Sequence, residues 1–175
     1  ILKCFDMTVA CTGISEKTAK FLGINYEKSF TYSPSNATYY PGALNMSIKL
    51  VFAKDDGKIL GAQIAGFDGV DKRCDVLATA IRAGMTVYDL TELELCYAPP
   101  FSSAKDPVNM AGYVAENILT GKVNVYHWHD IENIDKKKAT MLDVRTRDEN
   151  LAGAIERTIN IPLDELRPRL HELDK

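Results

Sequence analysis

The stretch NMSIKLVFAKDDGKILGAQIAG, residues 45–66, decides the fold of the first part of the chain. Apolar side chains alternate with other residues along 45–53, and the alternation resumes after KDDGK. Such alternation is typical of a strand with one buried face. The pair Asp56-Gly57 predicts a tight turn, because glycine reaches positive φ without steric cost. We therefore expect an antiparallel hairpin whose second strand covers residues 59–66.

The segments on either side of this hairpin predict further strands before it and helices after it. Runs rich in Val, Thr and aromatic residues predict strands over 5–11 and 26–32. Ser15 and Asp106 fit the N-caps of two helices, and Pro107 fits the first turn of the second helix. Strands followed by segregated helices predict an α+β fold, an antiparallel sheet with helices packed on one face. An apolar stripe at helical spacing is formed by Val70, Cys74, Leu77, Ala78, Ile81 and Met85.

The pattern changes at about residue 123, so we expect two domains, residues 1–122 and 123–175. In the second part strand-like and helix-like segments alternate, which is typical of a parallel α/β sheet. This part is short and ends just after a helix, so we expect a partial domain with an unpaired sheet edge. Its expected elements are strands at 125–126, 139–144 and 158–161, a helix or turn at 130–134, a helix at 148–152 and a last helix beginning near Pro168.

Composition and charge argue against several classes of partner. The 175 residues carry 21 Lys and Arg against 24 Asp and Glu, a net charge of −3, whereas nucleic-acid binding needs a basic surface. No apolar run reaches the roughly 20 residues of a membrane-spanning helix. The four cysteines lie far apart, without the spacing of zinc sites or disulfide frameworks. We therefore expect no nucleic-acid partner, no membrane partner, no metal, and reduced, mostly buried thiols in a cytoplasmic protein.

Three motifs in the first part carry a resemblance to a known family. They are FDMTVACTG at residues 5–13, NATYYPG at 36–42 and YAPPFSSAKDPVNMAGYVAENILTG at 97–121. Together they resemble the C-terminal dimerisation domain of the flavoprotein disulfide reductases, the pyridine nucleotide-disulfide oxidoreductases. The branch that they resemble most contains coenzyme A-disulfide reductases and NADH oxidases. The resemblance covers residues 1–122 and implies the α+β fold of that domain.

A second resemblance covers MLDVRTRDENLAGAIERTINIPLDEL, residues 141–166, which is similar to the first half of a rhodanese domain. Asp143 and Arg145 match the DVR motif of that family, which implies a structural pair beneath its active loop. The rhodanese cysteine would follow residue 175, so we expect no sulfur transfer by this chain alone. Some members of the reductase branch carry such a fusion, so the two resemblances support each other.

The reductase resemblance implies a larger parent enzyme that binds FAD and NAD(P)H in upstream domains and holds its redox-active cysteine there. This chain has no GxGxxG fingerprint, so we expect no cofactor bound to it alone. The resemblance also implies a homodimer in which this domain lends residues to the partner's flavin and cysteine site. The implied substrate of the parent is coenzyme A disulfide or a related small disulfide or oxidant.

Tyr39 and Tyr97 match the two active-site tyrosines of that branch, in YYPG and YAPP, and Tyr40 is the adjacent alternative to Tyr39. A phenol has a pKa near 10, so at neutral pH it can donate a hydrogen bond or a proton to a thiolate. The alternative interpretation is that these tyrosines are rim residues of a dimer interface. The loop that follows Tyr97 holds no histidine, which argues against a histidine relay and favours the branch with a single redox cysteine.

Several other side chains are weaker candidates. Lys105 and Asn109 are more typical of a helix start than of a substrate site, and Ser102 lacks a histidine that would activate it as a nucleophile. His127 and His129 have the spacing of some metal ligands, but two ligands do not complete a zinc site. Two other functions stay open. The chain is then either a stand-alone protein-interaction module or part of a rhodanese sulfurtransferase.

Overall fold

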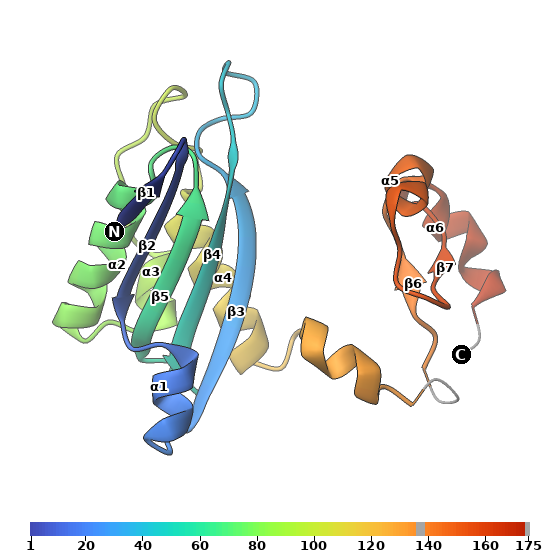
Figure 1. The fold of residues 1–175 in the computed structure, drawn as a ribbon, viewed down its shortest axis with the longest axis horizontal. Coiled ribbons are helices and arrows are strands. Elements are labelled where there is room, and N and C mark those ends of the chain that lie inside the picture. The colour runs from blue at the N-terminus through green and yellow to red at the C-terminus, as the bar shows by residue number, and fades with distance from the viewer. Residues whose placement is uncertain (136–138, 174–175) are drawn as a thin grey trace. The chain divides into compact units, whose positions relative to one another are not determined.

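The computed structural model describes residues 1–135 and 139–173, which form two compact units, Ile1–Val125 and Tyr126–Lys175. The first unit contains a five-stranded antiparallel sheet, with strand order β1-β2-β5-β4-β3 (Figure 1). The predicted α+β fold with an antiparallel sheet is confirmed. The strands are β1 (Leu2–Cys4), β2 (Met7–Gly13), β3 (Tyr26–Pro34), β4 (Asn45–Ala53) and β5 (Ile59–Gly66).

The predicted hairpin is confirmed with the expected bounds. Ser47 pairs with Ala65 and Ile48 with Ile64, and the register shifts by a bulge between Val51 and Phe52. The strand expected at 5–11 begins later, at Met7, because β1 and β2 form a hairpin of their own. Phe5 lies in the turn of that hairpin at φ 53°, a conformation that propensity does not predict for an aromatic residue.

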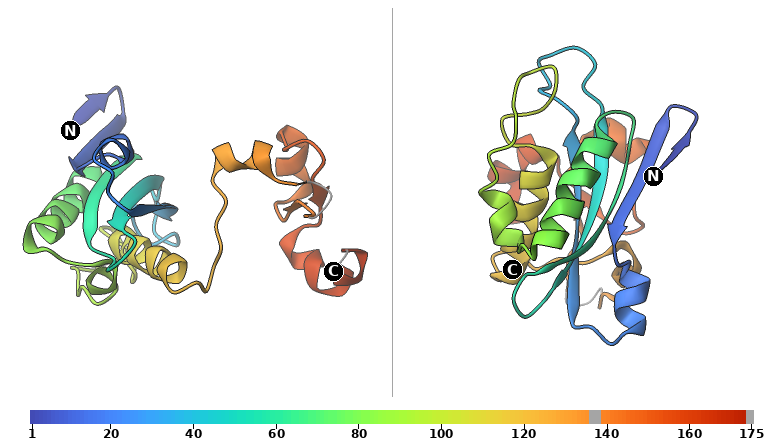
Figure 2. Two further views of the ribbon diagram at one scale, coloured as in Figure 1. Left: turned by 90° about the horizontal axis from the view of Figure 1, so that it is seen from below. Right: turned by 90° about the vertical axis from the view of Figure 1, so that its left-hand side faces the viewer.

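Helices α2 (Val70–Ala83, green in Figure 2) and α4 (Pro107–Leu119, yellow) cover one face of this sheet. The predicted caps are confirmed, since the Ser15 side chain accepts from the Thr18 amide and the Asp106 side chain from the Val108 amide. The side chains between sheet and helices form one apolar core that includes Ile48, Leu50, Phe52, Ile64, Leu77 and Val108. The helices are α1 (Glu16–Phe21), α2 (Val70–Ala83), α3 (Val87–Thr91) and α4 (Pro107–Leu119).

The inner face of the edge strand β3 carries hydroxyl groups. Ser29 pairs with Leu50 and Thr31 with Ile48, so these side chains face the helices as the core of β4 does. Both residues are buried beneath α4, which packs against β3. Within the described part of the chain, neither hydroxyl has a hydrogen-bond partner.

The opposite face of the sheet holds an ionic cluster centred on α1. The Glu16 carboxylate accepts hydrogen bonds from the Nζ atoms of Lys28 and Lys49, and from the Tyr26 hydroxyl at 3.2 Å. Lys28 is buried, so its charge depends on this carboxylate for compensation. Phe30 and other large apolar side chains on this face are exposed.

The second unit contains two short parallel strands, which confirms the predicted parallel pairing. The strand expected at 125–126 is wrong, since those residues pair with no other strand in the described structure. The last helix begins at Leu163 rather than near Pro168. Pro168 lies close to the end of this short helix, so the N–H that proline lacks removes a single backbone hydrogen bond from the helix. The elements are η1 (Trp128–Asn133), β6 (Leu142–Asp143), α5 (Arg147–Ala152), β7 (Ile159–Asn160), α6 (Leu163–Arg169) and η2 (Leu170–Glu172).

The four cysteines are free, but the expectation that most are buried is wrong. Cys4, Cys11 and Cys96 are exposed, and Cys74 alone of the four is buried. Cys4 and Cys11 lie on β1 and β2 at an edge of the sheet, while Cys96 lies in a loop. None of the described helices is both long and apolar enough to cross a bilayer.

Candidate functional site

Two loops at one end of the sheet bring the two predicted tyrosines together. Residues 35–44 connect β3 to β4, and residues 92–106 connect α3 to α4 (Figures 1 and 2). The hydroxyls of Tyr39 and Tyr97 share a hydrogen bond of 3.0 Å. Tyr39 is 76% exposed and Tyr97 48% exposed, so the pair can contact a group outside the chain.

Backbone bonds between the loops hold this pair. The Ala37 amide donates to the carbonyls of Pro99 at 3.3 Å and Ser102 at 3.0 Å. The Tyr40 amide in turn donates to the Ala37 carbonyl, which closes a turn around residues 37–40. Of the two neighbouring tyrosines in this turn, the structure brings the hydroxyl of Tyr39 to Tyr97.

The hydrogen bond between the phenols also affects the protonation of Tyr97. It raises the pKa of Tyr97 above its usual value near 10, and partial removal of water adds to the effect. Tyr97 therefore stays protonated throughout the neutral range. A protonated phenol on an exposed loop can donate a hydrogen bond to an anion such as a thiolate.

Beneath the loops lies a buried ion pair between Arg73 and Asp106, which are 1% and 2% exposed. Nη2 of Arg73 donates to Asp106 Oδ2 at 2.9 Å, and Nε donates to both carboxylate oxygens. Burial by itself would raise the pKa of Asp106, but hydrogen bonds from Arg73 and Ser102 outweigh it and hold that pKa below its usual value. The pair is therefore ionised at neutral pH.

Sequence reasoning missed Arg73, although a signal was present. Val70, Cys74 and Leu77 form the buried stripe of α2, and Arg73 lies on the same face by helical spacing. A charged residue within an apolar stripe indicates a buried partner, because an unpaired buried charge is costly. That partner, Asp106, lies 33 positions further along the chain, so spacing does not reveal it.

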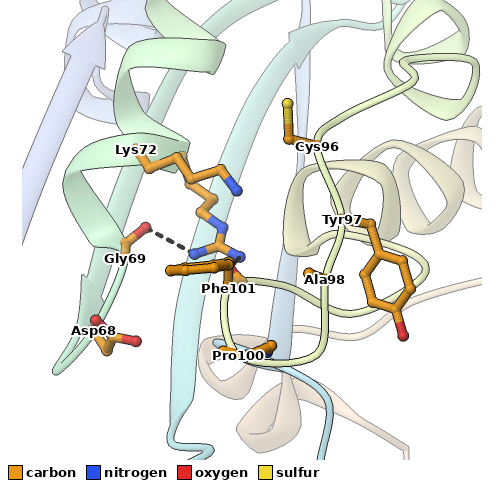
Figure 3. A pocket seen from close by; sticks show the side chains of 9 residues that line it. Asp68, Gly69, Lys72, Cys96, Tyr97, Ala98, Pro100 and Phe101 are labelled. Atoms are coloured by element: carbon orange, nitrogen blue, oxygen red, sulfur yellow. Dashed lines mark hydrogen bonds between the residues drawn. The ribbon is translucent and has the colours of Figure 1, made fainter.

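A cavity of about 400 Å³ lies beside the second loop (Figure 3). Figure 3 shows the Phe101 side chain extending from the second loop toward α2, which carries Lys72. The Tyr97 ring points away from Gly69. The lining therefore combines an ammonium group, apolar side chains and the exposed thiol of Cys96. The full lining is Asp68, Gly69, Lys72, Arg73, Cys96, Tyr97, Ala98, Pro100 and Phe101.

The weaker candidates have structural contacts. Lys105 Nζ donates to the Tyr113 hydroxyl at 2.9 Å and lies over its ring. Asn109 completes the capping box of α4 and donates to the carbonyls of Leu90 and Leu93. Ser102 is buried and donates to Asp106 Oδ2 at 2.6 Å, so it is no exposed nucleophile.

The histidines of the second unit do not meet a metal-ligand geometry. The rings of His127 and His129 stack with centroids 5.7 Å apart. Among the described residues, no group of three or more His, Cys, Asp or Glu side chains could hold a metal ion.

In the second unit, Asp143 and Arg145 form the pair that the DVR motif predicts. Arg145 Nη2 donates to Asp143 Oδ2 at 2.7 Å and to the Gly153 carbonyl at 2.8 Å. The Asn150 side chain donates to the same carboxylate. These hydrogen bonds hold the pKa of Asp143 well below its usual value. The pair ties β6 to the end of α5.

A family model described as the dimerisation domain of pyridine nucleotide-disulphide oxidoreductases matches residues 1–108. The chain belongs to this family. One curated relative, the coenzyme A disulfide reductase of Staphylococcus haemolyticus, is 41% identical over 118 residues, which cover 67% of this chain and 26% of the relative. The Staphylococcus aureus coenzyme A disulfide reductase, strain bovine RF122, is 39% identical over 116 residues.

Solved structures extend the similarity over nearly the whole chain. The reduced Bacillus anthracis CoADR-RHD matches with a TM-score of 0.94 and 56% identity, over 98% of this chain and 31% of that one. The NAD-dependent persulfide reductase of A. fulgidus matches with a TM-score of 0.88 and 40% identity, over the same shares. The chain therefore spans between a quarter and a third of the relatives it matches.

Proposed function

We propose that this chain is the C-terminal interface region of an FAD-dependent NAD(P)H:disulfide oxidoreductase of the coenzyme A-disulfide reductase or NADH oxidase type. In the homodimer it supplies Tyr39 and Tyr97 to the flavin and cysteine site of the partner subunit. The observation that carries the proposal is the 3.0 Å hydrogen bond between two exposed phenols from distant loops. Backbone bonds from Ala37 already join the two loops, and the exposure of both phenols leaves them accessible to a group outside the chain.

The chemistry of the pair suits a site where a thiolate forms and is consumed. Two linked phenols present a donor to a sulfur anion, and Tyr39 can hold Tyr97 in the orientation that donates. Donation to the thiolate stabilises it against its conjugate thiol, and the phenol can return a proton to a departing thiolate. In the intact enzyme FAD would supply the hydride and electron chemistry. This chain would contribute the hydrogen bond and the proton.

The test is Tyr97→Phe in the intact enzyme, assayed with NADH or NADPH and coenzyme A disulfide. Loss of a hydrogen bond made in the transition state predicts a fall in kcat of about 10- to 100-fold, with the KM for NAD(P)H unchanged. Tyr39→Phe should give a smaller loss, because Tyr97 keeps its own hydroxyl.

Tyr40→Phe is the matched control for these variants, since it removes the neighbouring hydroxyl from the same turn. Its turnover should equal that of the unmodified enzyme. If Tyr97→Phe leaves turnover unchanged, the pair has a packing role alone and the proposed function is wrong.

We further propose that residues 123–175 are the first part of a rhodanese-like domain fused to residues 1–122. The parallel pair β6 and β7 and the Asp143–Arg145 pair support this proposal. Two solved reductases match over 98% of the chain, so the similarity extends beyond residue 125. A full-length gene with a cysteine loop after residue 175 would extend the proposal to sulfur transfer.

The four free thiols are also compatible with the reducing cytoplasm, which we propose as the compartment.

A further inference from the structure

The guanidinium of Arg73 contacts both loops that carry the tyrosines. Its Nη2 donates to the Ser35 carbonyl at 2.8 Å, at the base of the first loop. The same nitrogen lies 3.4 Å from the Phe101 carbonyl and 3.4 Å from the Ser102 hydroxyl, in the second loop. A single planar group therefore bridges the bases of two loops that are distant in the sequence.

The base of the first loop is itself closed at Ser35. The Ser35 amide donates to the Leu44 carbonyl at 2.9 Å, and the Leu44 amide donates to the Ser35 hydroxyl at 3.3 Å. A shift of the Ser35 carbonyl would therefore move both ends of the loop that carries Tyr39. In the second loop, Arg73 contacts Phe101 and Ser102, whose amides donate to the Ala98 carbonyl and close the turn that follows Tyr97.

The start of α2 is shaped around this guanidinium. Gly69 precedes the helix at φ 64°, and its carbonyl accepts from Arg73 Nη1 at 3.2 Å (Figure 3, dashed line). A Cβ on Gly69 would lie 2.1 Å from that nitrogen. Asp106 fixes the other side, because it caps α4 and accepts from Nε and Nη2 at once. A lysine has a single nitrogen and reaches few of these acceptors together.

Resting on the proposed function, we propose that Arg73 is a positioning residue of the tyrosine pair. It holds the loops 35–44 and 92–106 at the separation at which the hydroxyls of Tyr39 and Tyr97 meet. The side chain is 1% exposed, and each of its three nitrogens donates to a protein acceptor, so in this proposal it acts through the loops. The bonds from Ala37 to Pro99 and Ser102 join the same loops. Arg73 holds the two loops close enough for those backbone bonds to form.

The test compares Arg73→Lys, and Arg73→Met combined with Asp106→Asn, with the unmodified 175-residue chain. The lysine variant keeps a positive charge beside Asp106. The double variant removes both charges and leaves asparagine, a good N-cap, at the start of α4. The readout is the pH titration of the tyrosine ring carbons by NMR, with the Tyr97 signal assigned from Tyr97→Phe. Tyr39→Phe gives the Tyr97 midpoint without the hydrogen bond between the phenols.

The expected result is a downward shift of the Tyr97 titration midpoint in both variants, as large as the shift from Tyr39→Phe. Adding Tyr39→Phe to either variant should then shift the midpoint no further, since the phenols no longer meet. Arg82→Met is the matched control, because Arg82 is an exposed arginine in the last turn of the same helix. It should leave the midpoint unchanged.

A Tyr97 midpoint at the unmodified value in either variant, with an unchanged circular dichroism spectrum, would overturn the positioning role. This outcome is separate from the fate of the proposed function, because the titration involves no turnover. Uncoupled phenols together with full turnover of the intact Tyr97→Phe enzyme would leave Arg73 as a positioning residue and discard the catalytic role of the pair.

Discussion

Among single residues, Glu16 shows how a small helix can anchor a sheet by charge. Burial alone would raise the pKa of its carboxyl group, but hydrogen bonds from Lys28 and Lys49 bring it down to about 2. The unfolded value is near 4.5, so the folded state favours the ionised carboxylate. The stabilisation is then complete above pH 4.5 and is lost as the pH falls toward 2.

Glu16→Gln should lower the free energy of unfolding at pH 7 by about 1–2 kcal/mol, because it leaves the buried Lys28 charge without a carboxylate. Urea unfolding between pH 7 and pH 2 measures this. The curves of the two proteins should converge as the pH falls, since the unmodified chain loses the same interaction. Glu92→Gln, at an exposed position, serves as the control. Curves that stay parallel down to pH 2 would contradict the assigned role of Glu16.

The tyrosines and Arg73 differ in how far the sequence predicts their place in the site. Tyr39 and Tyr97 could be chosen because short motifs surround them, although their contact depends on a turn that no motif describes. Arg73 was not predicted, because the loop carbonyls to which it donates lie more than 25 positions away on either side. Local spacing carries no record of such partners.

At the scale of elements, the features that were predictable are those fixed by neighbouring residues. The hairpin of β4 and β5, the stripe of α2 and the cap of α4 each arise from interactions within a few positions. The hairpin of β1 and β2 was missed because it depends on an aromatic residue, Phe5, at positive φ. The strand expected at 125–126 failed because a strand needs a partner, which short apolar runs do not guarantee.

The contact between α3 and α4 gives a prediction for a helix pair. Gly112→Ala in the middle of α4 would gain up to about 1 kcal/mol of helix propensity. A Cβ there would lie 2.8 Å from the Cβ of Leu90 and 3.0 Å from the Val87 carbonyl oxygen. Overpacking of this kind costs about 1–3 kcal/mol, so we expect a net loss of stability of about 1 kcal/mol.

Thermal or urea unfolding of Gly112→Ala measures whether the substitution lowers or raises the free energy of unfolding. Glu116→Ala on the same helix is the comparison, because its ion pair with Lys122 lies at the surface and should change stability by no more than about 0.5 kcal/mol. A more stable Gly112→Ala protein would show that α3 yields to the added methyl group.

At the scale of the whole molecule, membership of a family defined by its dimerisation domain predicts self-association. The 19.4 kDa chain should migrate as a species of twice that mass, and light scattering should give the mass directly. Dilution should shift the population toward the monomer. A particle of single-chain mass at the highest attainable concentration would show that dimer formation requires the rest of the enzyme.

The hydroxyls of Ser29 and Thr31 have a consequence for the molecule as a whole. Two buried hydroxyls that find no hydrogen-bond partner among the described residues leave the fold below its thermodynamic optimum. Both hydroxyls lie on the inner face of the edge strand β3, outside the two loops that carry Tyr39 and Tyr97. An apolar replacement at either position should therefore raise the free energy of unfolding without moving the loops that carry Tyr39 and Tyr97.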